Sequence, residues 1–313
     1  MLKKIFSASF KLMIVALAFL ISACAGSPQQ GGGVSQGISA SEAKSVKETL
    51  IVKVLDIGQG DAILLCAGGE NILIDTGDTS ARDKLVQELN IAGVKKIDKV
   101  IASHPHADHI GGMAAVLSNF EVGEVLDNGM PSTSPVWRGY MKTMKSKNIP
   151  RRNLVRGEKI AFKGGELEVL FPTAELVQAG QNKGYQHHPN DESVCLMLTY
   201  GKFSMLFTGD LEKKGEKELA DFYGERLKCN VLNSPHHGSK TSSSPPFLRA
   251  SAPEAVVISL GAGNSYGHPH DATLKKYALL KANVYRTDEL GTVTITTDGE
   301  TYKIGGAKDA SVS

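Results

Sequence analysis

The segment from Ser103 to His109 could bind metal, because it contains His104, His106, Asp108 and His109. It follows residues 98–102, an apolar run that predicts a strand. Side chains alternate along an extended chain, so His104 and His106 leave on the same side and can meet one ion. Asp108 and His109 follow where the chain turns, and they face a second position. Imidazole and carboxylate without thiolate suit zinc, iron or manganese and favour a catalytic metal site.

Further polar candidates stand where predicted strands end, and they are Asp75, Asp210, His236, His237 and His268. Loop residues carried by a rigid sheet are a common source of catalytic groups. Asp210 can bridge two cations with its two oxygens; the alternative is a helix N-cap. His236 and His237 point in opposite directions in an extended chain, so we expect one to bind metal and the other to contact substrate or a residue that supports a metal ligand. Asp75 is expected to orient a ligand histidine and fix its tautomer.

The hydrophobic pattern supplies a scaffold in two successive halves, each with strands followed by helices. Strands are predicted at about residues 50–55, 62–66, 71–77, 98–102, 194–200, 203–207, 229–233 and 255–260, with two or three more within 154–170 and a last hairpin around Asp298 and Gly299. Helices are predicted at about 81–91 with Ser80 as its cap, 110–117, 134–147, 213–223 and 272–280. This order favours an α/β fold with two sheets packed face to face and helices outside.

Length and composition allow one large domain preceded by an export signal. The chain has 313 residues, of which 41% are hydrophobic and 22% charged, so it can bury a full core. Residues 1–23 carry Lys3 and Lys4 before a short apolar run, which is typical of a signal peptide. Residues 20–24 resemble a bacterial lipobox in which Cys24 becomes lipid-bearing; ordinary cleavage is the alternative. We expect a signal at 1–23, a Gly/Ser/Gln-rich tether at 24–45, a domain at 46–306 and a tail at 307–313.

Charge and cysteine usage narrow the partners. Without residues 1–23, 32 basic side chains remain against 33 acidic ones, which gives no global affinity for polyanions. Residues 138–163, here called the basic stripe, contain nine Lys or Arg and one acid, Glu158. The stripe could track phosphates or could be a solvated surface. Cys66, Cys195 and Cys229 lie in apolar runs, which predicts buried thiols rather than disulfides.

Several motifs together resemble a known family. Residues 104–109, 75–77 and 208–210 are similar to the metal motif, the acidic strand end and the bridging aspartate of the metallo-β-lactamase superfamily. Residues 56–62, 235–242 and 266–269 resemble the extracellular hydrolase domain of the ComEC family of DNA-uptake proteins. The resemblance covers about residues 49–304. ComEC itself has a multi-span channel beside this domain, whereas a lipid anchor and tether are expected here.

The resemblance implies a single-domain, four-layer αββα sandwich that hydrolyses a substrate with two divalent cations, zinc or manganese, and no organic cofactor. We expect His104 and His106 to hold one ion, Asp108, His109 and His236 to hold the other, and Asp210 to bridge them. Asp108, Asp210, His237 and His268 are the expected catalytic residues. The substrate is expected to be a phosphodiester, namely extracellular DNA, as in competence. Alternatives are phosphocholine esters, lactones or β-lactams, or a non-catalytic metal-binding surface lipoprotein.

Two ligand positions stay open at this point. The superfamily usually supplies a further histidine before the late hairpin, and here Asn190 and His188 are the two candidates for that place. His268 competes with His236 as the last ligand of the second ion. The expected location is the outer face of a cell membrane, and the sequence leaves the oligomeric state open.

Overall fold

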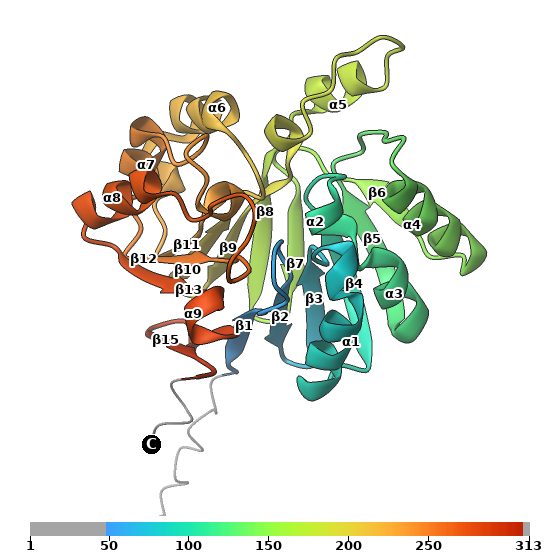
Figure 1. The fold of residues 1–313 in the computed structure, drawn as a ribbon, viewed down its shortest axis with the longest axis horizontal. Helices are drawn as coiled ribbons and strands as arrows, with labels where there is room; N and C mark the ends of the chain where they lie inside the picture. Colours follow the sequence, from blue (N-terminus) through green and yellow to red (C-terminus); the bar gives the residue numbers. More distant parts are fainter. Residues whose placement is uncertain (1–47, 309–313) are drawn as a thin grey trace, which may run out of the picture. The chain divides into compact units, whose positions relative to one another are not determined.

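Alternation of apolar and polar side chains along the strands determines how this chain folds. The computed structural model describes residues 48–308. The expected signal peptide, the tether and residues 309–313 of the tail lie outside these residues. The described strands form two sheets that face each other (Figure 1).

The eight-stranded sheet has the order β15-β14-β1-β2-β3-β4-β5-β6, and the seven-stranded sheet has the order β13-β12-β11-β10-β9-β8-β7. The strand bounds are β1 Leu50–Val54, β2 Ile63–Ala67, β3 Glu70–Ile74, β4 Lys96–Ala102, β5 Glu121–Asp127, β6 Arg151–Asn153, β7 Lys159–Phe162, β8 Gly165–Phe171, β9 Cys195–Tyr200, β10 Phe203–Phe207, β11 Val231–Asn233, β12 Ala255–Ile258, β13 Asn283–Arg286, β14 Val293–Thr297 and β15 Tyr302–Gly306. The predicted hairpins are confirmed, since β1 pairs with β2, β9 with β10 and β14 with β15, all antiparallel.

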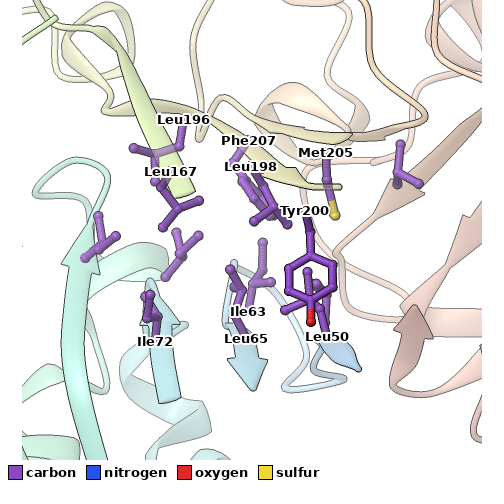
Figure 2. Packing of buried hydrophobic residues seen from close by; sticks show 14 of the residues in the cluster. Leu50, Ile63, Leu65, Ile72, Leu167, Leu196, Leu198, Tyr200, Met205 and Phe207 are labelled. Carbon is purple, nitrogen blue, oxygen red and sulfur yellow. The ribbon is translucent and has the colours of Figure 1, made fainter. Parts of the chain in front are cut away.

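The main core lies between the two sheets. Along β1 every second residue, Leu50, Val52 and Val54, is fully buried there. Leu196 and Leu198 of β9 belong to the same cluster from the opposite sheet. Figure 2 shows labelled members of this cluster, among them Leu50, Leu196 and Leu198, facing one another from the two sheets. Burial of each such aliphatic side chain contributes about 1.5–3 kcal/mol, so this layer fixes the two sheets against each other.

Helices cover both outer faces, which confirms the predicted four-layer αββα sandwich (Figure 1). The helix bounds are α1 Arg82–Ile91, α2 Ala107–Ile110, α3 Met113–Asn119, α4 Pro135–Ser146, α5 Ala174–Gly180, α6 Lys213–Tyr223, α7 Pro245–Ser251, α8 Asp271–Leu279 and α9 Thr287–Leu290. Helices α1, α3 and α4 pack on the first sheet through Leu85, Met113 and Tyr140, respectively. Helices α6, α7 and α8 pack on the second sheet through Leu219, Phe247 and Tyr277.

Each sheet contains a parallel set of strands whose carboxyl ends meet at one edge. In the first sheet β3, β4, β5 and β6 are parallel, and in the second β10, β11, β12 and β13 are parallel. The polar candidates of the sequence therefore follow strands that end side by side. This placement is what brings chain segments more than 100 residues apart to one site.

Two local predictions were wrong. Ser80 does not cap the first helix; it lies within the 3₁₀ turn η1 Thr79–Ala81, where Asp78 accepts from its backbone N–H. The helix predicted at 110–117 is broken into α2 and α3 at Gly111 and Gly112. A Cβ at Gly111 would lie 2.3 Å from the backbone N of Thr79, and one at Gly112 would lie 2.3 Å from the backbone O of Thr76, so this close approach requires glycine at both positions.

Candidate metal centre

The histidines after β4 form a first ligand group with Asp210. His106 is still extended, with φ −79° and ψ 153°, before α2 begins. His104 and His106 consequently point the same way, and His104 Nε2 lies 3.0 Å from His106 Nδ1. Asp210 Oδ2 lies 3.8 Å from His104 Nε2. The ligand atoms of His104, His106 and Asp210 all lie within 4.8 Å of one another.

A second ligand group shares Asp210 and contains Asp108, His109, Asp210 and His237. The Oδ1 atom of Asp210 lies 3.0 Å from His109 Nε2 and 3.5 Å from His237 Nε2. His237 Nε2 is also 3.5 Å from Asp108 Oδ2. The two oxygens of Asp210 thus face two different groups. Asp210 lies before Glu212, the residue that precedes α6, so it is not the helix cap that the sequence offered as an alternative.

The two neighbouring histidines of the turn η4 Pro235–Gly238 have different environments. His237 is 1% exposed and points into the second group, whereas His236 stands at the rim, with its Nδ1 3.1 Å from Thr241 Oγ1. His236 was expected in this group and His237 beside the substrate; in the structure His237 lies in the group, and His236 Nε2 lies 3.5 Å from Asp210 Oδ2. Both histidines have left-handed backbones, with φ of 51° and 52°. The alternation of an extended chain does not apply to such a turn.

Buried polar atoms without hydrogen-bond partners converge at the shared carboxylate. Within residues 48–308 they include His109 Nε2, Asp210 Oδ1 and His237 Nε2. A buried polar atom left unsatisfied costs about 1–3 kcal/mol, so three of them in one place indicate an external partner. Nitrogen and carboxylate oxygen donors in this arrangement fit divalent transition metals. The side chains present therefore fit the two cations that the sequence predicts.

Buried hydrogen bonds fix the ligand rings. Asp75 Oδ2 lies 2.7 Å from His109 Nδ1, and Ser103 donates to both carboxylate oxygens of Asp75 at 2.7 Å. His237 Nδ1 lies 2.9 Å from the carbonyl oxygen of Ser259. Donation from Nδ1 leaves the Nε2 lone pair of each ring facing Asp210. The orienting role expected for Asp75 agrees with this geometry.

The electrostatics of the cluster separate neutral from charged side chains. Burial lowers the pKa of His104 well below its usual range, so this ring is a neutral donor. Burial opposes the charge on Asp210, yet the imidazoles of His109 and His237 hold its pKa well below the usual range. His237 is also penalised by burial, but the Asp210 carboxylate raises its pKa to about 9. Asp210 is therefore ionised, and the protonated His237 ring supplies the positive charge that a bound cation would replace.

Asp61 belongs to this site and was not among the candidate residues. It is 3% exposed, accepts from Asn233 Nδ2 at 3.2 Å and has an Oδ1 that lies 3.8 Å from His237 Nδ1. Burial raises its pKa to about 6. The signal that could have identified Asp61 is its place in the motif at residues 56–62, which the sequence analysis used only for the resemblance.

The remaining sequence candidates stand around the two groups. His268 is half-buried, its ring centre lies 5.6 Å from that of His236 and 6.2 Å from that of His237, and burial lowers its pKa to about 4. Asn190 donates to Glu212 at 3.3 Å, and the backbone of His188 donates to the buried carboxylate of Glu192. Neither of the last two residues has a contact with His104 or His106 among the described hydrogen bonds. The choice between them therefore stays a prediction.

A groove opens beside the first group. It has a volume of about 740 Å³ and begins at His106. Its walls are the loops Pro131–Ser134 and Gly180–Glu192. The first ligand group is thus accessible from solvent on this side.

The basic stripe is largely neutralised by neighbouring carboxylates. Five of its nine cations have such a partner within 4 Å, and the pairs are Arg151 with Asp127, Arg152 with Glu158, Arg156 with Glu218, Lys159 with Glu166 and Lys163 with Glu48. The other four cations belong to α4 or follow it. The stripe therefore offers less free positive charge than its sequence indicates. Cys66, Cys195 and Cys229 are free thiols, as predicted; Cys195 and Cys229 are buried, whereas Cys66 is only partly buried.

Comparison with known proteins identifies relatives of this chain. ComE operon protein 3 of Bacillus subtilis (strain 168) is 31% identical over 261 residues, covering 77% of this chain and 32% of that protein. Competence protein ComA of Neisseria gonorrhoeae is 33% identical over 241 residues, covering 77% and 31%. The chain thus spans about a third of the length of these curated relatives. The resemblance to the ComEC family is confirmed.

A solved structure shares the fold. The metallo-beta-lactamase fold protein YhfI from Bacillus subtilis aligns with a TM-score of 0.50 and 11% identity, covering 82% of this chain and all of that one. Within residues 48–308, each helix is too short or too polar to cross a bilayer. Residues 55–262 match the metallo-beta-lactamase superfamily. By this match, together with its sandwich and its paired histidine–aspartate groups, the chain belongs to the metallo-beta-lactamase superfamily.

Proposed function

We propose that this protein is a metal-dependent phosphodiesterase that acts on DNA. The observation that carries the proposal is Asp210, whose two oxygens serve two ligand groups at once. A pair of divalent cations, zinc or manganese, supplies charge that makes water a nucleophile near neutral pH and stabilises the attacking and leaving oxygens of a phosphodiester. The names of the relatives, among them Competence protein ComA and Recombination protein 2, support nucleic acid as the substrate class.

The geometry supports a specific ligand assignment. His104 and His106 would hold the first cation, and Asp108, His109 and His237 the second, with Asp210 between them. This assignment exchanges the roles that the sequence analysis gave to His236 and His237. His237 is supported because its Nε2 is buried without a partner and lies 3.5 Å from both Asp108 and Asp210.

The rim residues would bind the substrate. His236 is part-exposed, with Nε2 3.5 Å from Asp210, and His268 stands next to it. Each has a ring nitrogen able to donate to a phosphate oxygen when protonated and to accept when neutral. In the proposal His236 and His268 hold the phosphodiester over the two groups. Asp108 and Asp210, which both lie beside His237 Nε2, fix the position of the ligand rings relative to the phosphate that reacts.

The direct test is hydrolysis by the purified protein loaded with manganese or zinc. Bis(p-nitrophenyl) phosphate and linear single-stranded DNA are the substrates, and a cephalosporin, a lactone and p-nitrophenyl phosphocholine represent the alternative reactions of the fold. We expect metal-dependent cleavage of bis(p-nitrophenyl) phosphate and of DNA, and its loss in His106→Ala. Cleavage that survives chelation, or turnover of an alternative substrate alone, would contradict the proposal. Metal binding without any turnover would favour the non-catalytic lipoprotein.

We further propose that the protein is exported and held at the outer side of a membrane by lipid on Cys24. The support is the apolar segment before Cys24 and the Gly/Ser/Gln-rich residues that follow it. In cell fractions we expect the parent in the membrane and Cys24→Ala outside it. Equal distribution of both would contradict the anchor. Participation in DNA uptake is likewise a proposal, because the chain spans about a third of its competence relatives.

A further inference from the structure

The loop between β12 and α8 holds an aromatic ring in solvent beside the metal centre. Tyr266 is 60% exposed. Its ring stacks on that of His268, with the centres 5.6 Å apart and an angle of 22° between the planes. One face of Tyr266 is therefore covered by His268. Because a ring has two faces and most of this side chain is exposed, the other face is open.

Hydrogen bonds of Asn264 fix this loop. Its Nδ2 donates to the carbonyl oxygens of Gly261 at 3.0 Å and His268 at 2.7 Å. Its Oδ1 accepts from the backbone N–H groups of Tyr266 at 3.2 Å and His268 at 3.0 Å. A single side chain thus ties both ends of the loop and the backbone of Tyr266 itself. The exposed ring is held in place before any ligand arrives, which lowers the entropic cost of binding.

The position of the ring relates it to the reacting centre. His268, which carries the stacked Tyr266, has its ring centre 6.2 Å from that of His237, a member of the second ligand group. Tyr266 is thus separated from that group by one imidazole. A base attached to a phosphodiester that is held over Asp210 can reach the open face of the Tyr266 ring. Aromatic side chains that receive bases in this way bind single strands with little sequence preference.

We propose that Tyr266 is a stacking subsite for one base of a single-stranded substrate, on the ring face opposite to His268. This inference rests on the proposed phosphodiesterase function and adds a preference to it. A base inside a duplex has both faces covered by its neighbours, so only an unstacked base can occupy the subsite. The enzyme should therefore cleave single strands better than duplexes, and strands with bases better than strands without them.

The test compares a thymidine oligonucleotide with a strand of equal length whose sugars carry no bases. The parent protein should cleave the base-bearing strand with the higher kcat/KM. Tyr266→Ala should raise KM for that strand about 10-fold, within the range expected for the loss of one base–aromatic stack. Tyr266→Phe keeps the ring and should keep the preference, whereas Tyr266→Leu keeps an apolar side chain without a ring and should lose it.

Phe222→Ala is the matched control, because Phe222 is 59% exposed on α6 and contacts Arg156 and Tyr223. It should keep the preference of the parent. Thermal unfolding of all variants checks that the fold is intact. A Tyr266→Leu protein that still prefers the base-bearing strand overturns the inference and leaves the phosphodiesterase proposal standing. A parent that cleaves neither strand overturns that proposal, and this inference falls with it.

Discussion

At the residue scale, Asp210 is the side chain on which both ligand groups depend. It is 2% exposed, and its two oxygens face different imidazoles. Asp210→Asn keeps the shape but removes the negative charge and one acceptor. We expect it to bind no more than one metal ion per chain and to lose at least about 100-fold in phosphodiester hydrolysis, given the usual weight of charge stabilisation. Metal analysis and a rate assay on bis(p-nitrophenyl) phosphate measure both effects.

The control for this change is Asp221→Asn, which removes the same charge from the exposed surface of α6, where Asp221 pairs with Lys217. It should retain two ions and the activity of the parent. An Asp210→Asn protein that kept two ions and full activity would show that the carboxylate is not shared.

Asp75 offers a second test at this scale. Its carboxylate lies 2.7 Å from His109 Nδ1 and is held by Ser103. Asp75→Asn can present an N–H where the carboxylate accepted, which disfavours the tautomer that faces Asp210. Loss of such an orienting partner typically weakens metal affinity by about 10–100-fold. Competition with a metal indicator should show weaker binding of one ion only. The partly exposed Asp78→Asn serves as the control, and equal affinities in both variants would contradict the role.

The sequence predicted part of this centre and missed part of it for a physical reason. His104, His106, Asp108 and His109 are close in the chain, so strand alternation and a turn were enough to divide them between two positions. The proposed choice of His237 over His236 depends on two successive left-handed residues, which no residue type at these positions indicates.

At the scale of elements, the turn between β1 and β2 packs directly on α2. A Cβ at Gly60, whose φ is +110°, would lie 2.1 Å from the carbonyl oxygen of Asp108. At Gly58, whose φ is +85°, a Cβ would meet nothing within 4 Å. Both Gly→Ala variants therefore carry backbone strain of about 1–3 kcal/mol, and only Gly60→Ala also displaces Asp108. In urea unfolding we expect both variants to have a lower free energy of unfolding than the parent. In the hydrolysis assay we expect Gly60→Ala to lose much more activity than Gly58→Ala. Equal activity of the two variants would separate this turn from the metal centre.

Glu216 joins α6 to the start of α7 and makes stability depend on pH. It is fully buried and accepts from the backbone N–H groups of Ser243 and Ser244. Burial raises its pKa, although those N–H groups and Lys276 oppose the shift. The folded state then binds the proton more tightly than the unfolded chain. The stabilising contribution is complete below the unfolded pKa and is lost as the pH rises through the folded pKa.

The measurement is the difference in free energy of unfolding between the parent and Glu216→Gln. That difference should shift against the parent as the pH rises above the ordinary glutamate pKa and through the raised pKa of the folded state. The exposed Glu218→Gln, on the same helix, should show a flatter profile. A parallel pH profile for the parent and Glu216→Gln would contradict the raised pKa.

The sequence predicted the strands and helices that are well buried better than those at the edges of the fold. Strand β1 buries alternate residues, and β9 buries a continuous apolar run, so both were predicted from their hydrophobic pattern. Strand β13 is short, lies at a sheet edge and has two exposed residues out of four, so its sequence carries no such signal. Helices α5 and α7 have seven residues each, too few to establish a helical period.

At the scale of the whole molecule, the succession of two strand-and-helix halves predicted the four layers correctly. The halves bring parallel strand ends to one edge, and that edge assembles residues from Asp61 to His268. Charge was less informative, because a run of cations in the sequence does not show which carboxylates fold back onto it. Arg151 and Arg156, for example, pair with Asp127 and Glu218.

We propose that two divalent cations lie on either side of Asp210. Anomalous diffraction from crystals grown with manganese would locate both ions. We expect two anomalous peaks, with one oxygen of Asp210 directed at each. One peak should be contacted by His104 and His106, and the other by Asp108, His109 and His237. A single peak, or peaks outside these two groups, would contradict the proposal.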